Sequence, residues 1–173
     1  MPHGSGAASL SPSLTLKAAF HGGFSLWYGM PLIRQQGWEY KLRLFLDSKS
    51  DSNFAWGTND CCSMVCEWIR LSTGTDVYAD FSGKYTTQIG AYRVIKTVTG
   101  GIDEENAAEY VTKQFDMPEV LVLMAQRGDV VLFDAPEGKR LGIVSLHPAR
   151  AVFLTDTGLK YERTADCRRA WKV

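Results

Sequence analysis

The chain has 173 residues, and its 19 lysines and arginines balance 19 aspartates and glutamates, so the formal net charge is zero. A protein that binds nucleic acid through its phosphates needs more basic than acidic residues. The equal numbers here exclude a general electrostatic nucleic-acid binder. Apolar residues make up 45% of the chain, and no apolar run approaches the roughly 20 residues that a membrane-spanning helix needs. These numbers predict one globular domain with room for an additional arm, and no membrane span.

The first 31 residues are expected to form an extended or disordered arm. Residues 1–12 are mainly Gly, Ser, Ala and Pro, which bury too little apolar surface to fold. They also lack the basic residues that begin a secretory signal, so we expect the protein to be made and kept in a cytoplasm. Residues 14–30 carry large apolar side chains among three glycines. This pattern favours docking on a neighbouring subunit, or covering the chain's own domain, through Phe20, Phe24, Trp27 and Tyr28.

The domain is expected over residues 32–173, and its first half is predicted to be helical. Apolar residues recur at helical spacing over 36–47. Residues 58–60 are all good N-cap types, so a buried helix should begin at Asp60, run to Leu71 and stop at Gly74. Two further helices are predicted over 85–98 and 107–115.

The second half is predicted to be an antiparallel sheet. Short apolar runs alternate there with turns rich in Gly, Pro and Asp. Helices followed by strands indicate an α+β domain with the helices packed on the sheet, and the N-terminus of the helix over Asp60 to Leu71 should abut the strand that contains residues 130–133. The predicted strands cover residues 130–133, 141–146, 151–154, 159–161 and 170–173.

Cys61 is the first candidate for chemistry, because it follows Asp60 at the start of the buried helix. Free amide groups and the positive helix end stabilise a thiolate at that position, as a nucleophile requires. The alternative is a structural cysteine buried in a helix. A metal or iron–sulfur site is a third possibility, although the chain has no Cys-x-x-Cys pair and the cysteines could equally pack as small apolar residues. Its four ligands would be Cys61, Cys62, Cys66 and Cys167.

The order of several short motifs resembles the NlpC-type branch of the papain-like cysteine peptidases, and more narrowly a phage and prophage tail-associated group of that superfamily. The resemblance covers residues 32–173 and implies a papain-like fold with Cys61 at the nucleophile position and Asp60 before it. The motifs are Trp38, Trp56-Gly57, Asp60-Cys61, Thr73-Gly74, Tyr85, Gly128-Asp129, Leu141-Gly142-Ile143 and Cys167-Arg-Arg-Ala-Trp171.

The chain departs from this family pattern at the general base. The family places a histidine just before Val-Gly-Ile, whereas Arg140 stands there in this chain. A guanidinium keeps its proton at neutral pH and cannot act as a base. Of the three histidines, His3 and His21 lie in the arm, and His147 lies about 20 Å further along an extended strand. His147 is therefore either a substitute base or a turn residue.

The resemblance implies a protein of a phage tail tip or baseplate, which has kept the peptidase scaffold but lost the base and acts structurally. Its partners would be neighbouring tail-tip proteins, and it would pass from the host cytoplasm into the virion. The alternative is an active peptidoglycan peptidase that uses Cys61 during genome entry. A metal or iron–sulfur protein of the same assembly is the second alternative. For the first two functions we expect no cofactor.

Overall fold

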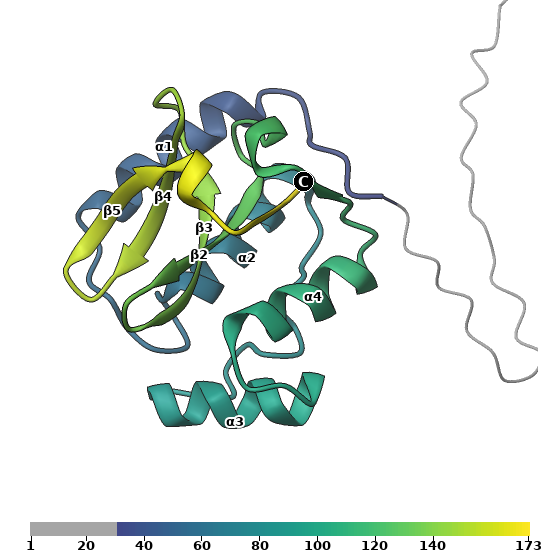
Figure 1. Ribbon diagram of the computed structural model, residues 1–173, viewed down its shortest axis with the longest axis vertical. Coiled ribbons are helices and arrows are strands. Elements are labelled where there is room, and N and C mark those ends of the chain that lie inside the picture. The colour runs from purple at the N-terminus through teal and green to yellow at the C-terminus, as the bar shows by residue number, and fades with distance from the viewer. Residues whose placement is uncertain (1–30) are drawn as a thin grey trace, which may run out of the picture.

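The computed structural model describes residues 31–173, which form an α+β domain of four α-helices and a six-stranded antiparallel sheet (Figure 1). The predicted arm, with Phe20, Phe24, Trp27 and Tyr28, lies outside the described residues, so its docking stays a prediction. No helix of the described part is both long and apolar enough to cross a membrane. The predicted class, helices on a small antiparallel sheet, is confirmed.

All four helices precede the strands along the chain, as predicted, but their bounds differ. The Cys61 helix begins and ends where capping residues predict: Asp60 is its N-cap, and Gly74 is its C-cap with a left-handed φ of 86°. The last helix starts three residues earlier than predicted, because Asp103 and Asn106 form a capping box that precedes the apolar residues. The helices are α1 (Trp38–Ser50), α2 (Cys61–Thr73), α3 (Gln88–Thr99) and α4 (Glu104–Gln114).

All of the predicted strands are present, and one short strand was missed. The sheet order is β1-β6-β2-β3-β4-β5. The missed strand is β1, which has only two residues and pairs with β6; so short a run carries no alternation to detect. The strands are β1 (Glu119–Val120), β2 (Val130–Ala135), β3 (Gly138–Val144), β4 (Arg150–Thr155), β5 (Gly158–Arg163) and β6 (Arg169–Trp171), with short 3-10 turns η1 (Val122–Met124) and η2 (Thr164–Asp166).

Helix α2 is the central helix of the domain, and it packs mainly on β3 and β4 rather than on β2 (Figure 1). The N-terminus of this helix was predicted to abut β2. The contact near β2 lies instead toward the middle of α2, where Trp68 Nε1 donates to the carbonyl of Gly128 at 2.8 Å, just before β2. Helix α1 covers α2, α4 packs on β3, and α3 packs on α4. This arrangement brings the start of α2 to β3, where Arg140 lies.

Alternate residues of the strands divide the core into two clusters. Val130, Leu132, Leu141 and Ile143 face the helices and join the main core. Their neighbours face the other side of the sheet, where a second cluster is partly covered by η1 and by Cys167. Side chains on both faces of β2, β3 and β4 are therefore buried. This explains why the sequence of these strands contains continuous apolar runs rather than an alternation of apolar and polar residues.

The Gly128-Asp129 motif anchors the entry to β2. Asp129 Oδ1 pairs with Arg34 at 2.5 Å, and its Oδ2 accepts the backbone N–H of Gln126 at 2.8 Å. Arg34 also stacks over the ring of Trp38, with 4.3 Å between its guanidinium carbon and the ring centroid. Asp129 thus binds a backbone amide and a guanidinium, and the motif holds the start of the domain against the sheet.

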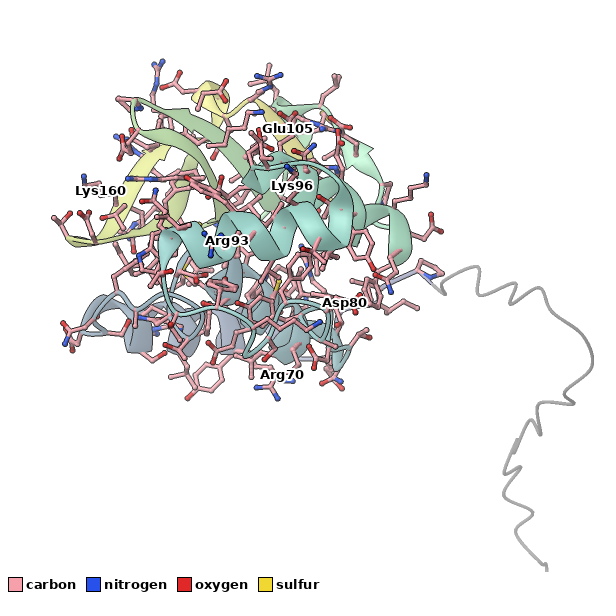
Figure 2. All side chains as sticks on the ribbon, turned by 90° about the horizontal axis from the view of Figure 1, so that it is seen from below. Arg70, Asp80, Arg93, Lys96, Glu105 and Lys160 are labelled. Atoms are coloured by element: carbon pink, nitrogen blue, oxygen red, sulfur yellow. The ribbon has the colours of Figure 1, made fainter. Side chains whose placement is uncertain are left out.

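A network of charges joins α4 to the sheet. Lys139 of β3 pairs with Asp103 at 2.9 Å and also with Glu105, and Arg169 of β6 pairs with Glu105 at 3.1 Å and Glu119 at 2.7 Å. Figure 2 shows Glu105 on the sheet side of α3, whose Arg93 and Lys96 are exposed. Arg169, near the carboxyl end of the chain, is therefore a paired cation that ties β6 to α4.

Candidate functional site

Asp60 organises the start of α2 through contacts from three directions. One carboxylate oxygen accepts the backbone N–H of Ser63 at 2.8 Å. The other accepts the N–H of Gly57 at 2.7 Å and the hydroxyl of Tyr85 at 2.8 Å. The Ser63 hydroxyl accepts in turn from the Asp60 N–H at 2.7 Å, which completes a capping box. Asp60 is thus a buried structural acceptor whose oxygens are already occupied, and it fixes the position of Cys61.

Two phenols continue this network behind Asp60. Tyr85 donates its single hydroxyl proton to Asp60, so Tyr78 donates to Tyr85 across their 2.7 Å separation. Burial raises the pKa of both phenols, which keeps them protonated and able to donate at neutral pH. The segment that precedes α3 is thereby held against the start of α2. Tyr85, which the family resemblance singled out, is a positioning residue for the Cys61 segment.

Cys61 is the first residue of α2, and its side chain lines two adjoining hollows. One is a surface pocket of about 360 Å³, and the other is a small apolar cavity of about 40 Å³ that reaches into the core. Cys61 itself is 8% exposed. It therefore lies at a helix start, as the sequence predicted for a nucleophile, and it also borders a pocket that is open to solvent. The surface pocket is also lined by Phe54, Trp56, Gln88, Tyr92, Glu104, Glu137, Gly138, Lys139, Arg140, Leu154, Thr155 and Asp156.

Arg140, the residue just before Leu141-Gly142-Ile143, lines the same pocket as Cys61. It lies on β3 opposite Phe133 of β2, and its guanidinium pairs with Glu137 three residues earlier. A guanidinium keeps its proton at neutral pH, so Arg140 cannot take a proton from Cys61.

Glu104 is the residue of this site that sequence reasoning missed. It is the first residue of α4, is 9% exposed, and lines both hollows with Cys61. Its carboxylate makes no hydrogen bond or ion pair with another residue in the described range 31–173. Burial raises its pKa, and the nearby charges of Asp103 and Asp60 add to that effect, while a hydrogen bond from its own backbone N–H and the charge of Lys139 oppose it. The capping signal of Asp103 and Asn106 would have placed Glu104 at a helix start, but only the fold brings it to Cys61.

The other three thiols differ from Cys61. The pKa of Cys62 is raised by a hydrogen bond to the Cys61 thiol and by burial. Burial also raises the pKa of Cys66, and raises that of Cys167 to about 12. These three side chains therefore stay protonated at neutral pH, as buried structural cysteines do.

The structure does not form the four-thiolate metal site. Cys61, Cys62 and Cys66 line the internal cavity, whereas Cys167 belongs to the second cluster, on the far face of the sheet. Within residues 31–173 no three Cys, His, Asp or Glu side chains converge in a way that could hold a metal ion. The hypothesis fails because the sheet separates Cys167 from α2.

His147 is not brought to Cys61 either. It lies in the connection between β3 and β4, with its ring against Tyr161 at 5.5 Å between centroids, and it lines a different pocket. Strand β3 continues from Arg140 to Val144 and pairs there with Ala151, so the chain does not bend back toward Cys61. The geometry favours a turn residue over a substitute base. His3 and His21 lie outside the described residues.

The sequence of the domain matches a family profile over residues 33–173, described as a domain of unknown function (DUF6950). The chain belongs to this family. The profile begins beside Arg34 and ends with the last residue of the chain, so it includes Cys61, Glu104 and Arg140. No curated protein matches the chain in sequence.

Replacing Glu104 with glutamine is expected to raise the free energy of unfolding at neutral pH by about 1 kcal/mol, because a buried carboxylate costs more than a neutral amide. The folded-state pKa of Glu104 is raised, so its contribution is most favourable below the unfolded value of about 4.3 and declines as the pH rises through the folded value. The advantage of Glu104→Gln should therefore grow as the pH rises from about 4 toward neutral.

Urea unfolding across this pH range measures the difference between the two proteins. Asp103, Glu105 and Glu119 have lowered pKa values because of their ion pairs, and they reduce stability at acid pH in both proteins equally. The matched control is Glu109→Gln, which removes an exposed carboxylate from the same helix and should give no gain. A Glu104→Gln variant that is less stable at pH 7 would show that the carboxylate is favourably bound.

Proposed function

We propose that this chain is a structural subunit of a phage tail tip or baseplate, built on a papain-like, NlpC-type scaffold that has kept the nucleophile position and lost the base. The phage context comes from the motif resemblance. The observation that carries the structural role is the composition of the pocket at Cys61. Cysteine catalysis needs a base within hydrogen-bond reach. The family's base position is held by Arg140, which is paired with Glu137, and His147 lines another pocket.

An exposed apolar surface supports a role in assembly. Leu121, Leu123 and Met124, in and beside the turn η1, are 77%, 82% and 66% exposed. A pocket of about 520 Å³ adjoins them and is lined by Val122, Leu123 and Trp38 among others. Large apolar side chains that are exposed close together on a surface are typical of protein interaction sites. We call Leu121, Leu123 and Met124 the η1 patch and propose that it contacts a neighbouring tail protein.

The second candidate function is an active peptidoglycan peptidase. Cys61 favours it, because its side chain lies at a helix start and opens onto a pocket large enough for part of a peptide. This function requires that a residue other than histidine in the described domain acts as the base. Cys61, as the nucleophile, would then be essential for activity.

The purified full-length protein is expected to release no product from peptidoglycan or its stem peptides, since loss of the base from a nucleophile–base unit costs several orders of magnitude in rate. Chromatography of digests, with a buffer blank as reference, measures this. Turnover that disappears in Cys61→Ala would reject the structural role in favour of the peptidase. Any turnover that persists in Cys61→Ala comes from a contaminant.

The η1 patch should be needed for assembly and dispensable for folding. Leu123→Asp is expected to leave the thermal unfolding temperature nearly unchanged, because the side chain is already in water, and to abolish incorporation into tails purified from cells that make the phage. The matched control is Ile89→Asp, which changes an exposed isoleucine on α3 and should incorporate normally. Normal incorporation of Leu123→Asp would remove the η1 patch from the proposal.

A further inference from the structure

The η1 patch lies beside a hollow, and the two together have the form of a docking groove. Leu121, Leu123 and Met124 are among the most exposed large apolar side chains of the described residues. The hollow of about 520 Å³ next to them has apolar walls from η1, from Val144 of β3 and from Trp38 of α1. A row of exposed apolar side chains beside such a hollow fits an apolar polypeptide segment better than a small polar molecule.

The sequence of this chain contains a segment of matching composition. Residues 14–30 carry several large apolar side chains, including Phe24 and Trp27, and Lys17 is their only lysine, arginine, aspartate or glutamate. The rest of the segment can therefore enter an apolar hollow without burying an unpaired charge. Lys17 also has a complement there, because Glu39 carries the one carboxylate among the described residues that line the hollow.

The domain sets the direction in which the chain leaves it. Arg34 is fixed at the edge of the domain by Asp129 at 2.5 Å and by the backbone carbonyl of Arg127 at 2.8 Å. In both views the first described residues lead away from the helices and the sheet (Figures 1 and 2). Fully extended, residues 14–30 span about 55 Å, whereas a domain of this size has a radius of gyration of about 14 Å. The segment is therefore long enough to reach another copy of the domain.

We propose that the η1 patch and its hollow bind residues 14–30 of a second copy of this chain. This inference rests on the proposed role in assembly, because it names the neighbouring protein that the η1 patch contacts. The donating segment and the accepting patch are different surfaces. Each copy can therefore bind one neighbour through its segment and another through its patch, and such a contact links copies head to tail.

The test measures self-association of the purified full-length protein by analytical ultracentrifugation over a range of concentrations. Wild type should associate as its concentration rises. Leu123→Asp alters the acceptor and Trp27→Asp alters the donor, and each should weaken association by about tenfold or more. An equal mixture of the two variants should recover pairs and nothing larger, because the intact segment of one binds the intact patch of the other.

Two control variants carry the same change outside the proposed contact. Ile89→Asp changes an exposed side chain of α3, and Ser9→Asp adds a charge before the apolar segment. Both should associate as wild type does. Circular dichroism of each variant confirms that it is folded before association is compared.

Three outcomes would overturn this inference. A wild-type protein that stays monomeric would mean that the segment binds its own domain or another protein. Unchanged association of Leu123→Asp or Trp27→Asp would remove that surface from the contact, and a mixture that recovers no pairs would mean that the two surfaces do not meet. The role in assembly has a separate readout: if Leu123→Asp still fails to enter tails, that role stands and the η1 patch contacts a different protein.

Discussion

Replacing Asp60 with alanine is expected to lower the free energy of unfolding by about 3 to 5 kcal/mol, a large part of a typical domain's stability. The carboxylate accepts three hydrogen bonds, from Ser63, Gly57 and Tyr85. Its removal takes away the N-cap of α2 and leaves buried donors without an acceptor, and each such donor costs about 1 to 3 kcal/mol. Chemical denaturation followed by tryptophan fluorescence measures the loss.

The matched control is Asp103→Ala at the start of α4. Asp103 has the same capping box with the residue three positions later, but it is partly exposed and has no buried phenol beside it. The cap alone is worth about 1 kcal/mol, and loss of the Lys139 ion pair adds little at a partly solvated site. Equal losses in the two variants would mean that Tyr85 and Gly57 add nothing to the cap at Asp60, and that the network does not hold Cys61 in place.

Gly57→Ala is expected to destabilise the protein by a similar amount, about 3 to 5 kcal/mol, for a different reason. Gly57 has a φ of 79°, which costs about 1 to 2 kcal/mol for any residue with a Cβ. An added Cβ would also overlap the backbone carbonyl oxygen of Tyr85, and relief of that clash must move one of the two segments that bind Asp60. Thermal unfolding, with the reactivity of Cys61 as a local probe, measures both effects.

Gly37→Ala separates the two causes. Gly37 has nearly the same φ, 77°, but within residues 31–173 no atom of a non-adjacent residue lies within 4 Å of the position that its Cβ would take. This variant should lose only the cost of the left-handed backbone, about 1 to 2 kcal/mol. If Gly57→Ala is no worse than Gly37→Ala, the close approach of Gly57 to Tyr85 is not important for stability, and the Trp56-Gly57 motif needs another explanation.

The features that the sequence predicted well depend on residues close together in the chain. The start of α2 at Asp60 and its end at Gly74 follow from side chains and a left-handed glycine within one turn of each end. The class of the sheet follows from apolar runs and turn residues, since hairpin strands pair with their neighbours along the chain. The position of Cys61 at a helix start could be predicted because a capping motif is local.

Sequence alone thus determined the α+β class, the Cys61 helix and the absence of a histidine before Leu141. Tertiary structure decided which side chains share the pocket: Glu104 reaches Cys61 from another helix, and Tyr85 reaches Asp60 across 25 residues. The tertiary structure also places His147 in a separate pocket and Cys167 on the far face of the sheet. The physical reason is that a pocket forms where elements distant in the chain pack, and packing depends on buried shape and volume rather than on local pattern.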